Sequence, residues 1–355
     1  MPTELAEPRT GAPSTEDEPA THPAPARGRR YRAAALRSIG LYALTMMAVV
    51  MVVFALPRAM PGDPLRALED PDNSYYLSDP ELRAQLQEYY GLDKPLVEQF
   101  RSYVTGLATG DLGFSIARKA EVSHLIRLHL PWTLLLMGVS LALASGLSFM
   151  AGVAATWKRG RFGDRALTIG LTIARAVPEY ALAAVLLISF AVVVPLFPLA
   201  GAKTPFNDYT GAHKYYDIAR HMVLPVTALT LSLLGTKFLL VRNTMISTLG
   251  QDYMVLARAK GLPDRMMKYR HAGRNALLPF LTVLGIQAGF AVGGSVFVET
   301  VFAYPGMGTL ILRAVEARDY PVLEATFLVL ALVVLAVNLL LELIYARVDP
   351  RVGAE

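Results

Sequence analysis

Long apolar runs separated by shorter polar segments dominate the pattern of this sequence, and six of the runs are long enough to cross a membrane. A membrane helix needs roughly 20 mostly apolar residues to cross a hydrocarbon layer of about 30 Å. Backbone polar groups find no partners in lipid, so such runs are predicted to be helices. The pattern therefore predicts an all-α membrane protein with six transmembrane helices. The runs are Ser38–Leu56, Pro131–Thr156, Ala166–Phe197, Met222–Val241, Ala276–Val298 and Val322–Ala346.

The composition supports this class, because 54% of the residues are hydrophobic and only 18% are charged, whereas a soluble domain carries about a quarter charged residues. The formal net charge is +5, which in a membrane protein indicates basic cytoplasmic loops rather than a nucleic-acid partner. The chain contains no cysteine, which excludes disulfides and thiolate metal ligands.

The first apolar run follows a polar leader that contains Arg29, Arg30 and Arg32. A secretory signal peptide shows the same order of features, but its apolar region spans only about 7–15 residues. We therefore expect a retained helix over 36–56. The leader lacks periodicity and is expected to be a disordered cytoplasmic tail over 1–35.

Lysine and arginine are enriched in alternate loops, which sets the expected orientation. The segments 157–165 and 242–275 are basic and are expected to be cytoplasmic, together with both termini. Residues 57–130, whose acids outnumber their bases, are expected to form a large extracytoplasmic insert. The remaining helices make a core over 131–346, followed by a cytoplasmic tail over 347–355.

The insert is predicted to contain one amphipathic helix. Asp93 is a candidate N-cap with Pro95 in the first turn, and Gly110 ends the helix. Two interpretations stay open: a cap that receives a partner protein, or a lid over the span ends in which Asp63 and Asp111 only turn the chain. The apolar residues at helical spacing are Leu96, Phe100, Val104 and Leu107.

A basic segment, 252–279, lies between the fourth and fifth runs and is predicted to fold as two helices joined by a sharp turn. Gly261 can adopt the left-handed conformation that ends a helix, and Pro263 suits the first turn of the next one. Ala257 and Ala259 are small and leave room for a partner. The segment is either a docking element or a basic loop on anionic lipid headgroups.

Several polar side chains fall within the apolar runs, where charge is costly and usually faces the helix bundle or a water-filled cavity. Arg175 and Glu179 have the i,i+4 spacing of a helical pair, so they either face a pathway or a partner, or pair with each other. Lys237 is expected to extend to the cytoplasmic interface. Gln287 is a further candidate for the pathway. A run of small residues expected to pack against a partner subunit comprises Gly285, Gly289, Gly293 and Gly294.

No pattern in the sequence indicates a catalytic or metal site. His124 and His129 lack the i,i+4 spacing of a helical metal pair and have no cysteine nearby. The chain also lacks a Gly-x-x-x-x-Gly-Lys-Ser/Thr phosphate loop, so it is not expected to bind ATP itself.

The basic segment reads Ala-Arg-Ala-Lys-Gly-Leu over 257–262 and Arg-Asn-Ala-Leu-Leu-Pro over 274–279. It resembles the EAA loop of ATP-binding-cassette (ABC) importer permeases, in the dipeptide, oligopeptide and nickel branch. It departs from that branch at Val255 and Leu256, where Arg and Thr are usual, and at Gly273, where Leu is usual.

Further short motifs match the same branch in order and spacing, and together they extend the resemblance over nearly all of the chain after the tail. The motifs are Pro61-Gly62-Asp63-Pro64, Tyr90-Gly91-Leu92-Asp93-Lys94-Pro95-Leu96, Gly110-Asp111-Leu112-Gly113-Phe114-Ser115, Glu299-Thr300-Val301-Phe302, Pro305-Gly306-Met307-Gly308, Arg318-Asp319-Tyr320-Pro321 and Asp349-Pro350-Arg351.

The resemblance implies a type I ABC importer permease fold with a large extracytoplasmic loop after helix 1. It implies a cell-membrane subunit that moves peptides or similar small solutes and is not itself an enzyme, because separate ATPase subunits bind ATP and Mg²⁺. The implied partners are a second homologous permease, two ATP-binding subunits and an extracytoplasmic solute-binding protein. The implied ATPase-coupling residues are Tyr253, Ala257, Arg258, Ala259, Lys260, Gly261, Leu262, Asp264 and His271, and the pathway or inter-subunit candidates are Arg175, Glu179, Gln287 and Glu299.

Nickel or another non-peptide solute of the same family is the alternative substrate. A secondary transporter or channel is a second alternative, but it would usually show inverted repeats and paired broken helices, and no convincing repeat is present. A membrane-anchored enzyme would need exposed catalytic residues in 57–130, and none stands out.

Overall fold

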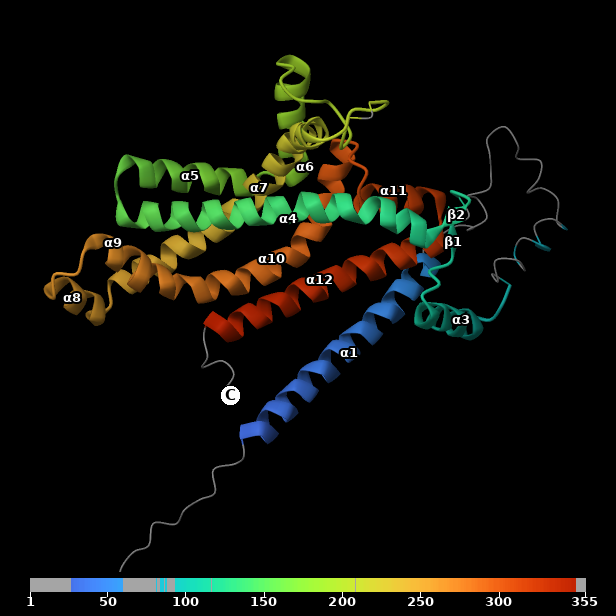
Figure 1. Cartoon of the computed structure of the whole chain (residues 1–355), viewed down its shortest axis with the longest axis horizontal. Helices are drawn as coiled ribbons and strands as arrows, with labels where there is room; N and C mark the ends of the chain where they lie inside the picture. Colours follow the sequence, from blue (N-terminus) through green and yellow to red (C-terminus); the bar gives the residue numbers. More distant parts are fainter. Residues whose placement is uncertain are drawn as a thin grey trace, which may run out of the picture. The chain divides into compact units, whose positions relative to one another are not determined.

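The computed structural model describes residues 27–59, 81, 84, 85, 87, 93–115, 117–207 and 209–348. The chain divides into two units, 1–47 and 48–355, and each is considered by itself. Most of the expected tail, the motifs at 61–64 and 349–351, and residues 90–92 lie outside the described residues. Figure 1 gives the order of the elements along the chain.

The described part is almost entirely helical, with a single two-stranded antiparallel sheet in which Phe114 pairs with Glu121. In chain order the elements are α1 (Arg27–Ala59), α3 (Leu96–Thr109), β1 (Phe114–Ser115), β2 (Ala120–Glu121), α4 (Val122–Trp157), α5 (Phe162–Ala176), α6 (Glu179–Leu187), the π-helix η2 (Ile188–Val193), α7 (Ala212–Leu249), α8 (Asp252–Ala259), α9 (Asp264–Met266), the π-helix η3 (Met267–Gly273), α10 (Arg274–Val301), α11 (Met307–Ala317) and α12 (Tyr320–Val348).

Four helices are each long and apolar enough to cross a membrane, and two bent helix pairs bring the number to as many as six among the described residues. The four are Gly40–Ala59, Val122–Trp157, Ala212–Leu249 and Tyr320–Ile344. Helix α1 already begins at Arg27, so residues 27–35 are helical rather than part of a disordered tail. Helix α7 begins at Ala212, before the predicted Met222, because the polar residues of its first turns continue the same helix.

The third predicted span is not one helix. Helices α5 and α6 meet at an angle of 102° across Val177 and Pro178. The proline ring disfavours helical geometry in the preceding residue, and Val177 is extended, with φ −82° and ψ 127°. The fifth span is also bent, by 56° between Gly289 and Gly293. The prediction of a continuous helix over Ala166–Phe197 is therefore wrong, and the break falls at the proline.

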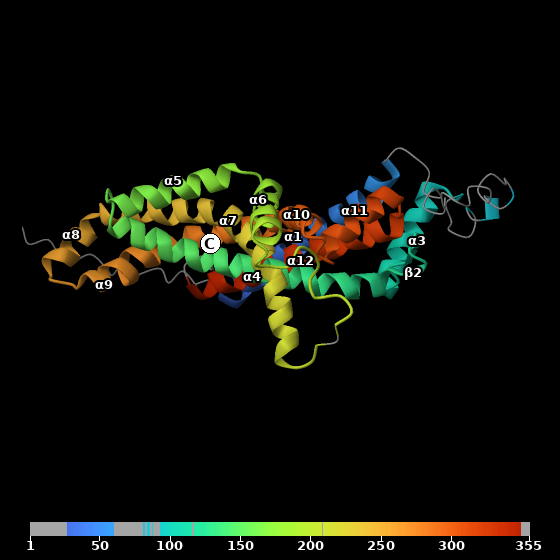
Figure 2. The same cartoon turned by 90° about the horizontal axis from the view of Figure 1, so that it is seen from above.

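Helices α4, α5 and α7 lie side by side in both views of the fold (Figures 1 and 2). Glycines allow the close approach. A Cβ at Gly152 of α4 would lie 2.8 Å from the Val241 Cβ of α7. A Cβ at Gly235 of α7 would lie 2.6 Å from the Leu171 carbonyl oxygen of α5. Any side chain at these two positions would clash at the present distance between the helices, so only glycine allows this close packing.

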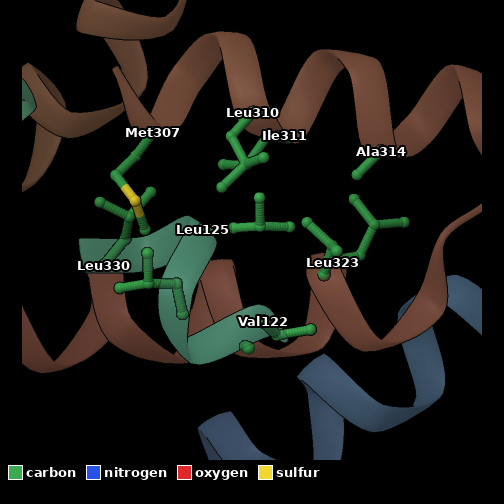
Figure 3. Packing of buried hydrophobic residues seen from close by; sticks show 11 residues of the cluster. Val122, Leu125, Met307, Leu310, Ile311, Ala314, Leu323 and Leu330 are labelled. Atoms are coloured by element: carbon green, nitrogen blue, oxygen red, sulfur yellow. The ribbon is translucent and has the colours of Figure 1, made fainter. Parts of the chain in front are cut away.

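Helix α11 packs into an apolar cluster that joins the beginnings of α4 and α12 (Figure 3). Leu310, Ile311 and Ala314 of α11 point toward Leu125 of α4 and Leu323 of α12. The remaining members of this core are Val122, Ile126, Met307, Val322, Ala325 and Leu330. The cluster gives α11 a fixed position across the two longer helices.

The helix predicted in the insert is present as α3, and Gly110 ends it in the left-handed conformation, with φ 78°. Its start differs from the prediction. Pro95 rather than Asp93 is the N-cap, and the Pro95 carbonyl accepts the first hydrogen bonds, from the N–H groups of Glu98 and Gln99. The ring of Phe100 packs edge-on against Phe54 of α1, with the ring centres 5.1 Å apart.

Candidate functional site

Residues 252–273, which we call the basic hairpin, form two short helical segments joined by a tight turn. The N–H of Gly261 donates to the Arg258 carbonyl at 3.0 Å, and the N–H of Leu262 donates to the Ala257 carbonyl at 3.3 Å. This pair of bonds is the Schellman motif, in which the residue just after the helix adopts the left-handed conformation. Gly261 supplies it, with φ +72°. The predicted left-handed conformation of Gly261 is confirmed, and Pro263 is the N-cap of α9 rather than part of its first turn.

One face of the basic hairpin packs against its own bundle. Met254 and Ala257 of α8 are buried, together with Met267 and Ala272 of η3. The cluster that they join includes Val153 of α4, and also Val241, Met245, Ala276 and Phe280. Ala257 therefore faces the bundle and fixes the position of α8, whereas Ala259 is exposed. The hairpin is thus packed against α4, α7 and α10.

The other face of the basic hairpin is open and both apolar and basic. Val255 and Leu256 are 64% and 55% exposed, and Tyr253 beside them is 43% exposed. Arg258 and Lys260 are also exposed. A groove of about 850 Å³ runs along the second segment, lined by Pro263, Arg265, Met266, Tyr269 and Arg270. The arrangement can receive a protein surface that carries apolar and acidic groups.

Three further residues of the hairpin have defined surroundings. The hydroxyl of Tyr253 accepts a hydrogen bond from the Asn275 side chain at 2.5 Å, which ties α8 to the start of α10. Asp264 is exposed in the first turn of α9. His271 is half-buried in η3, and within the described residues its Nε2 atom has no hydrogen-bond partner.

Gly273, where the resembled branch usually has leucine, is buried. A Cβ at this position would lie 3.1 Å from the Lys268 carbonyl oxygen.

A buried ion pair braces the bundle next to the hairpin, and sequence reasoning did not identify it. Arg242 of α7 donates two hydrogen bonds to Asp164 of α5, from Nε at 2.7 Å and from Nη2 at 2.9 Å. The N–H of Gly160 donates to the same carboxylate at 3.0 Å. The side-chain hydroxyl of Thr156 donates to the Arg242 carbonyl at 3.3 Å. The ion pair joins α4, α5 and α7. The sequence signal that could have indicated it was the opposite charges at the ends of two apolar runs.

Glu299 lies at the opposite end of α10 and holds the start of α11. The Thr133 hydroxyl of α4 donates to its Oε1 at 2.7 Å, and the Gly308 N–H donates to its Oε2 at 2.7 Å. The N–H of Met307 in turn donates to the Thr133 hydroxyl. A Cβ at Gly306 would lie 2.3 Å from the Glu299 Cδ atom. The carboxylate is fully buried and bound by its own chain, which explains why glycines follow the proline in this motif.

Two other motifs meet through a buried aspartate. Ser115, the last residue of β1, donates its hydroxyl hydrogen bond to Asp319 Oδ2, and the Ala117 N–H donates to the same oxygen at 3.2 Å. Asp319 lies in the turn between α11 and α12. Asp111 accepts a hydrogen bond from the Gly113 N–H at 2.9 Å, as in a local turn. The short motifs at 110–115 and 318–321 are therefore parts of one contact.

A second ion pair, also not predicted, joins α1 to α12. Arg58 donates to the Glu324 carboxylate from the same Nη1 atom that donates to the Phe54 carbonyl, and its Nε donates to Gln99 of α3. The guanidinium also lies 3.6 Å from the centre of the Phe54 ring. Burial and the nearby Glu324 carboxylate raise the pKa of the Tyr103 hydroxyl above its ordinary value.

The polar residues within the spans differ in their surroundings, and the expectation for Lys237 is wrong. Lys237 is fully buried between α7 and α4 and donates to the Ser145 hydroxyl at 3.1 Å, so it does not extend to the interface. Arg175 and Glu179 are separated by the bend, and no ion pair joins them among the described residues. Gln287 is 9% exposed, inside α10.

Three of the four glycines in the run of α10 pack within this chain, whereas a Cβ at Gly293 would have no atom within 4 Å, so the predicted face for a partner subunit is left only at Gly293. A Cβ at Gly285 would meet Leu341 of α12 at 3.3 Å, and one at Gly289 would meet Val334 of α12 at 3.7 Å. Gly294 lies against Glu179 of α6. The bundle itself uses these small residues, because α12 and α6 approach α10 closely.

The described residues contain no group of three or more His, Asp or Glu side chains arranged to hold a metal ion. The Nδ1–H group of His129 donates to the Leu125 carbonyl of its own helix at 2.8 Å.

Comparison with known proteins matches these features to one family. Residues 144–354 match the model described as the inner membrane component of binding-protein-dependent transport systems. The chain is 36% identical over 309 residues to a Brucella ovis protein described as a peptide permease, covering 86% of this chain and 94% of that one. It is 33% identical to the di/tripeptide transport system permease protein DppB of Pseudomonas aeruginosa, covering 89% and 97%.

A further relative is similar to the same extent. The oligopeptide transport system permease protein AppB of Bacillus subtilis is 34% identical over 308 residues, covering 86% of this chain and 95% of that one. The family model spans the C-terminal part of α4 and all later helices, including the basic hairpin, and the relatives match 86–89% of the chain. The chain belongs to the family of binding-protein-dependent transport system inner membrane components: it is a multi-pass permease subunit of an ABC importer with the type I permease fold, and it works with ATPase and substrate-binding partners.

Proposed function

We propose that this permease imports peptides, and that the basic hairpin transmits the movement of a cytoplasmic ATPase to the membrane helices. The relatives that are described as carriers of peptides, di/tripeptides and oligopeptides support a peptide substrate, because each matches nearly its whole length. The chain pairs with a second homologous permease. Two ATPases serve the pair, and a solute-binding protein delivers peptide from outside.

In this proposal both chain termini, the 157–165 loop and the basic hairpin are cytoplasmic. The clustering of Lys and Arg supports that orientation, since loops rich in basic residues stay on the cytoplasmic side. The insert that contains α3, β1 and β2 is then extracytoplasmic and lies on the side from which peptide arrives. A non-peptide solute such as nickel is the alternative cargo within the same family.

The two faces of the basic hairpin carry the coupling proposal. Tyr253, Val255 and Leu256 form an apolar docking face, and Arg258 and Lys260 supply positive charge at its edge. On the opposite face, Met254 and Ala257 are seated in the apolar cluster of the bundle. A rigid element that contacts the ATPase on one side and packed helices on the other converts ATPase closure into helix movement.

The Arg242–Asp164 brace supports rigid transmission. It holds α5 to α7 beside the hairpin, so a push on α8 moves a braced group of helices rather than one helix end. Bidentate pairs of this kind fix orientation as well as distance. Gln287 and Glu299 remain candidates for the pathway or for contacts between subunits, although both are buried within this chain.

The coupling proposal is tested by replacing Gly261 with valine. At φ +72° an L-residue costs about 1–2 kcal/mol, and a β-branched side chain costs more, while no atom lies within 4 Å of the new Cβ. We expect the importer to insert and assemble, to hydrolyse ATP, and to lose peptide transport. The measurement is peptide uptake and ATP hydrolysis in proteoliposomes that contain the complete importer.

Gly250→Ala is the matched control, because Gly250 precedes the hairpin with an ordinary φ of −83° and its Cβ would lie 3.5 Å from the Ser247 carbonyl. It should transport at the wild-type rate. Unchanged transport in Gly261→Val would contradict the docking role of the hairpin. Peptide uptake by the lone subunit, without ATPases, would instead favour a secondary transporter, and uptake of nickel but not peptides would favour the alternative cargo.

A further inference from the structure

The bend between α5 and α6 exposes backbone groups at a depth where few partners are available. Val177 and Pro178 break the helix, so the last carbonyls of α5 cannot be bonded by a following helical turn. Within the described residues, no backbone N–H donates to the last turn of α5 from beyond it, and no side chain caps the start of α6. Unpaired backbone at membrane depth is tolerated only inside protein or along a water-filled cavity.

The bend also separates two charges that a straight helix would have paired. Glu179 turns inward, where its Oε2 accepts a hydrogen bond from the Ser232 hydroxyl at 3.1 Å. Its other oxygen would lie 2.6 Å from a Cβ at Gly294, so it fills the space that this glycine leaves. Arg175 is exposed, and no described acidic group lies within ion-pair distance of its guanidinium. The Glu179 carboxylate is therefore bound within the bundle, whereas the Arg175 guanidinium has no acidic partner among the described residues.

With the basic loop 158–161 at the cytoplasmic membrane surface, as proposed above, the charge of Arg175 lies well inside the membrane. It is near the end of α5, which begins at Phe162 beside the basic loop 158–161 and lies along α4 and α7 (Figure 1). At 1.5 Å per residue, the distance along the axis from the start of α5 is roughly 20 Å. An unpaired guanidinium at that depth faces water or a partner rather than lipid. The open carbonyls of α5 next to it need hydrogen-bond donors, which a water-filled cavity supplies.

We infer that Arg175 lines the translocation pathway and binds the carboxylate of the peptide as it passes the α5–α6 bend. The inference rests on the proposed peptide substrate and adds the chemical group that is recognised. A guanidinium presents two parallel N–H donors that match a carboxylate. The carbonyls at the end of α5 accept N–H groups from the adjoining peptide bonds. A carboxylate of the second permease subunit would satisfy the guanidinium but would supply no donor for these carbonyls.

Gly235 fixes the geometry of this site. A Cβ at Gly235 would lie 3.0 Å from the Arg175 Cβ and 2.6 Å from the Leu171 carbonyl oxygen, so the last turn of α5 is pressed against α7. The base of the Arg175 side chain is thereby held while its guanidinium remains accessible. A flexible loop would not offer a defined position for a charged group.

The direct test is site-specific crosslinking, which is favoured by the absence of cysteine from the chain. A Thr172→Cys variant, which keeps Arg175 and places a thiol one helical turn before it on the exposed side of α5, is assembled into the complete importer with cysteine-free partner subunits. It is incubated under turnover with tripeptides that carry an activated disulfide on the side chain of either the C-terminal or the N-terminal residue. We expect the variant to capture the C-terminally labelled peptide several-fold more than the N-terminally labelled one. Arg165→Cys, exposed on the same helix, is the control and should capture neither preferentially.

A transport measurement complements the crosslinking. Arg175→Gln should lower peptide uptake about tenfold or more, the loss typical of a charge-assisted hydrogen bond, and Arg175→Lys should retain part of it. ATP hydrolysis stimulated by the loaded binding protein should stay near the wild-type rate. Parallel loss of assembly or ATP hydrolysis would indicate a structural role and overturn the inference.

The remaining outcomes are equally decisive. Capture of the second permease subunit, and of neither peptide, when Thr172→Cys carries a thiol-to-amine crosslinker would assign the charge to an ion pair between subunits. Equal capture of both peptides, or capture of neither while the importer turns over, would also overturn carboxylate recognition. If the wild-type importer takes up no peptide, the proposed peptide substrate itself fails, and this is observed before any variant is compared.

Discussion

Substitutions of Glu299 are predicted to lower stability by graded amounts, because the two carboxylate oxygens accept hydrogen bonds from different donors. Oε1 accepts from the Thr133 hydroxyl and Oε2 accepts from the Gly308 N–H, both at 2.7 Å. Glu299→Ala removes both acceptors in a site that is fully buried. Each buried donor left without a partner costs about 1–3 kcal/mol, and the cavity adds to this. We expect a total destabilisation of about 3–6 kcal/mol.

Glu299→Gln should cost less, because the amide keeps the shape of the side chain. Its oxygen can accept the Gly308 N–H, and its NH₂ group can donate to the Thr133 oxygen, which also accepts from the Met307 N–H. Only the hydroxyl hydrogen of Thr133 then loses its acceptor. The expected cost is about 1–3 kcal/mol.

The assay is thermal unfolding of the purified assembled importer in detergent. Unfolding is monitored as the loss of the monodisperse peak in size-exclusion chromatography. Glu316→Ala is the control, because Glu316 is exposed on α11, the helix that Glu299 binds. This variant should unfold at the same temperature as the wild type. The expected order of unfolding temperature is wild type, then Glu299→Gln, then Glu299→Ala. If the glutamine variant were as unstable as the alanine variant, or if alanine cost less than about 1 kcal/mol, the hydrogen-bond reasoning would be refuted.

Two further predictions concern the packing of the bundle. Arg242→Lys keeps the charge but loses the two parallel bonds to Asp164, and should lower stability by about 1–3 kcal/mol; a variant that unfolds with the wild type would show that charge alone suffices. Gly152→Ala places a Cβ 2.8 Å from the Val241 side chain and should cost about 1–3 kcal/mol. Adding Val241→Ala should recover part of that loss in the same unfolding assay, and a purely additive double variant would count against a direct clash.

The class of the protein and the turn of the basic hairpin could be predicted from the sequence. Apolar runs of membrane length identify helices because lipid leaves the backbone no alternative. Gly261 was identifiable because only a glycine adopts the left-handed geometry of the turn without cost, and the structure places it there with φ +72°. The end of α3 at Gly110 follows from the same local preference.

Expectations that depended on distant neighbours were less successful. Lys237 was assigned to the interface from its place in α7, but α4 covers it and Ser145 accepts its hydrogen bond. The glycines of α10 indicated close packing, but not that α12 and α6 of the same chain would occupy the space. Proline at 178 was visible, yet pairing between Arg175 and Glu179, one of the two interpretations left open, assumed that the helix continued through it.

The sequence by itself determined that this chain crosses a membrane with helices, where a sharp turn divides the basic hairpin, and, through its short motifs, which family it resembles. These properties depend on one stretch of chain and on the solvent around it. Only the tertiary structure decided that Glu299 binds α11, that Arg242 binds Asp164, and that Glu179 is held while Arg175 is open. The partners in such pairs are far apart in sequence, so their meeting depends on how whole helices pack rather than on any local preference.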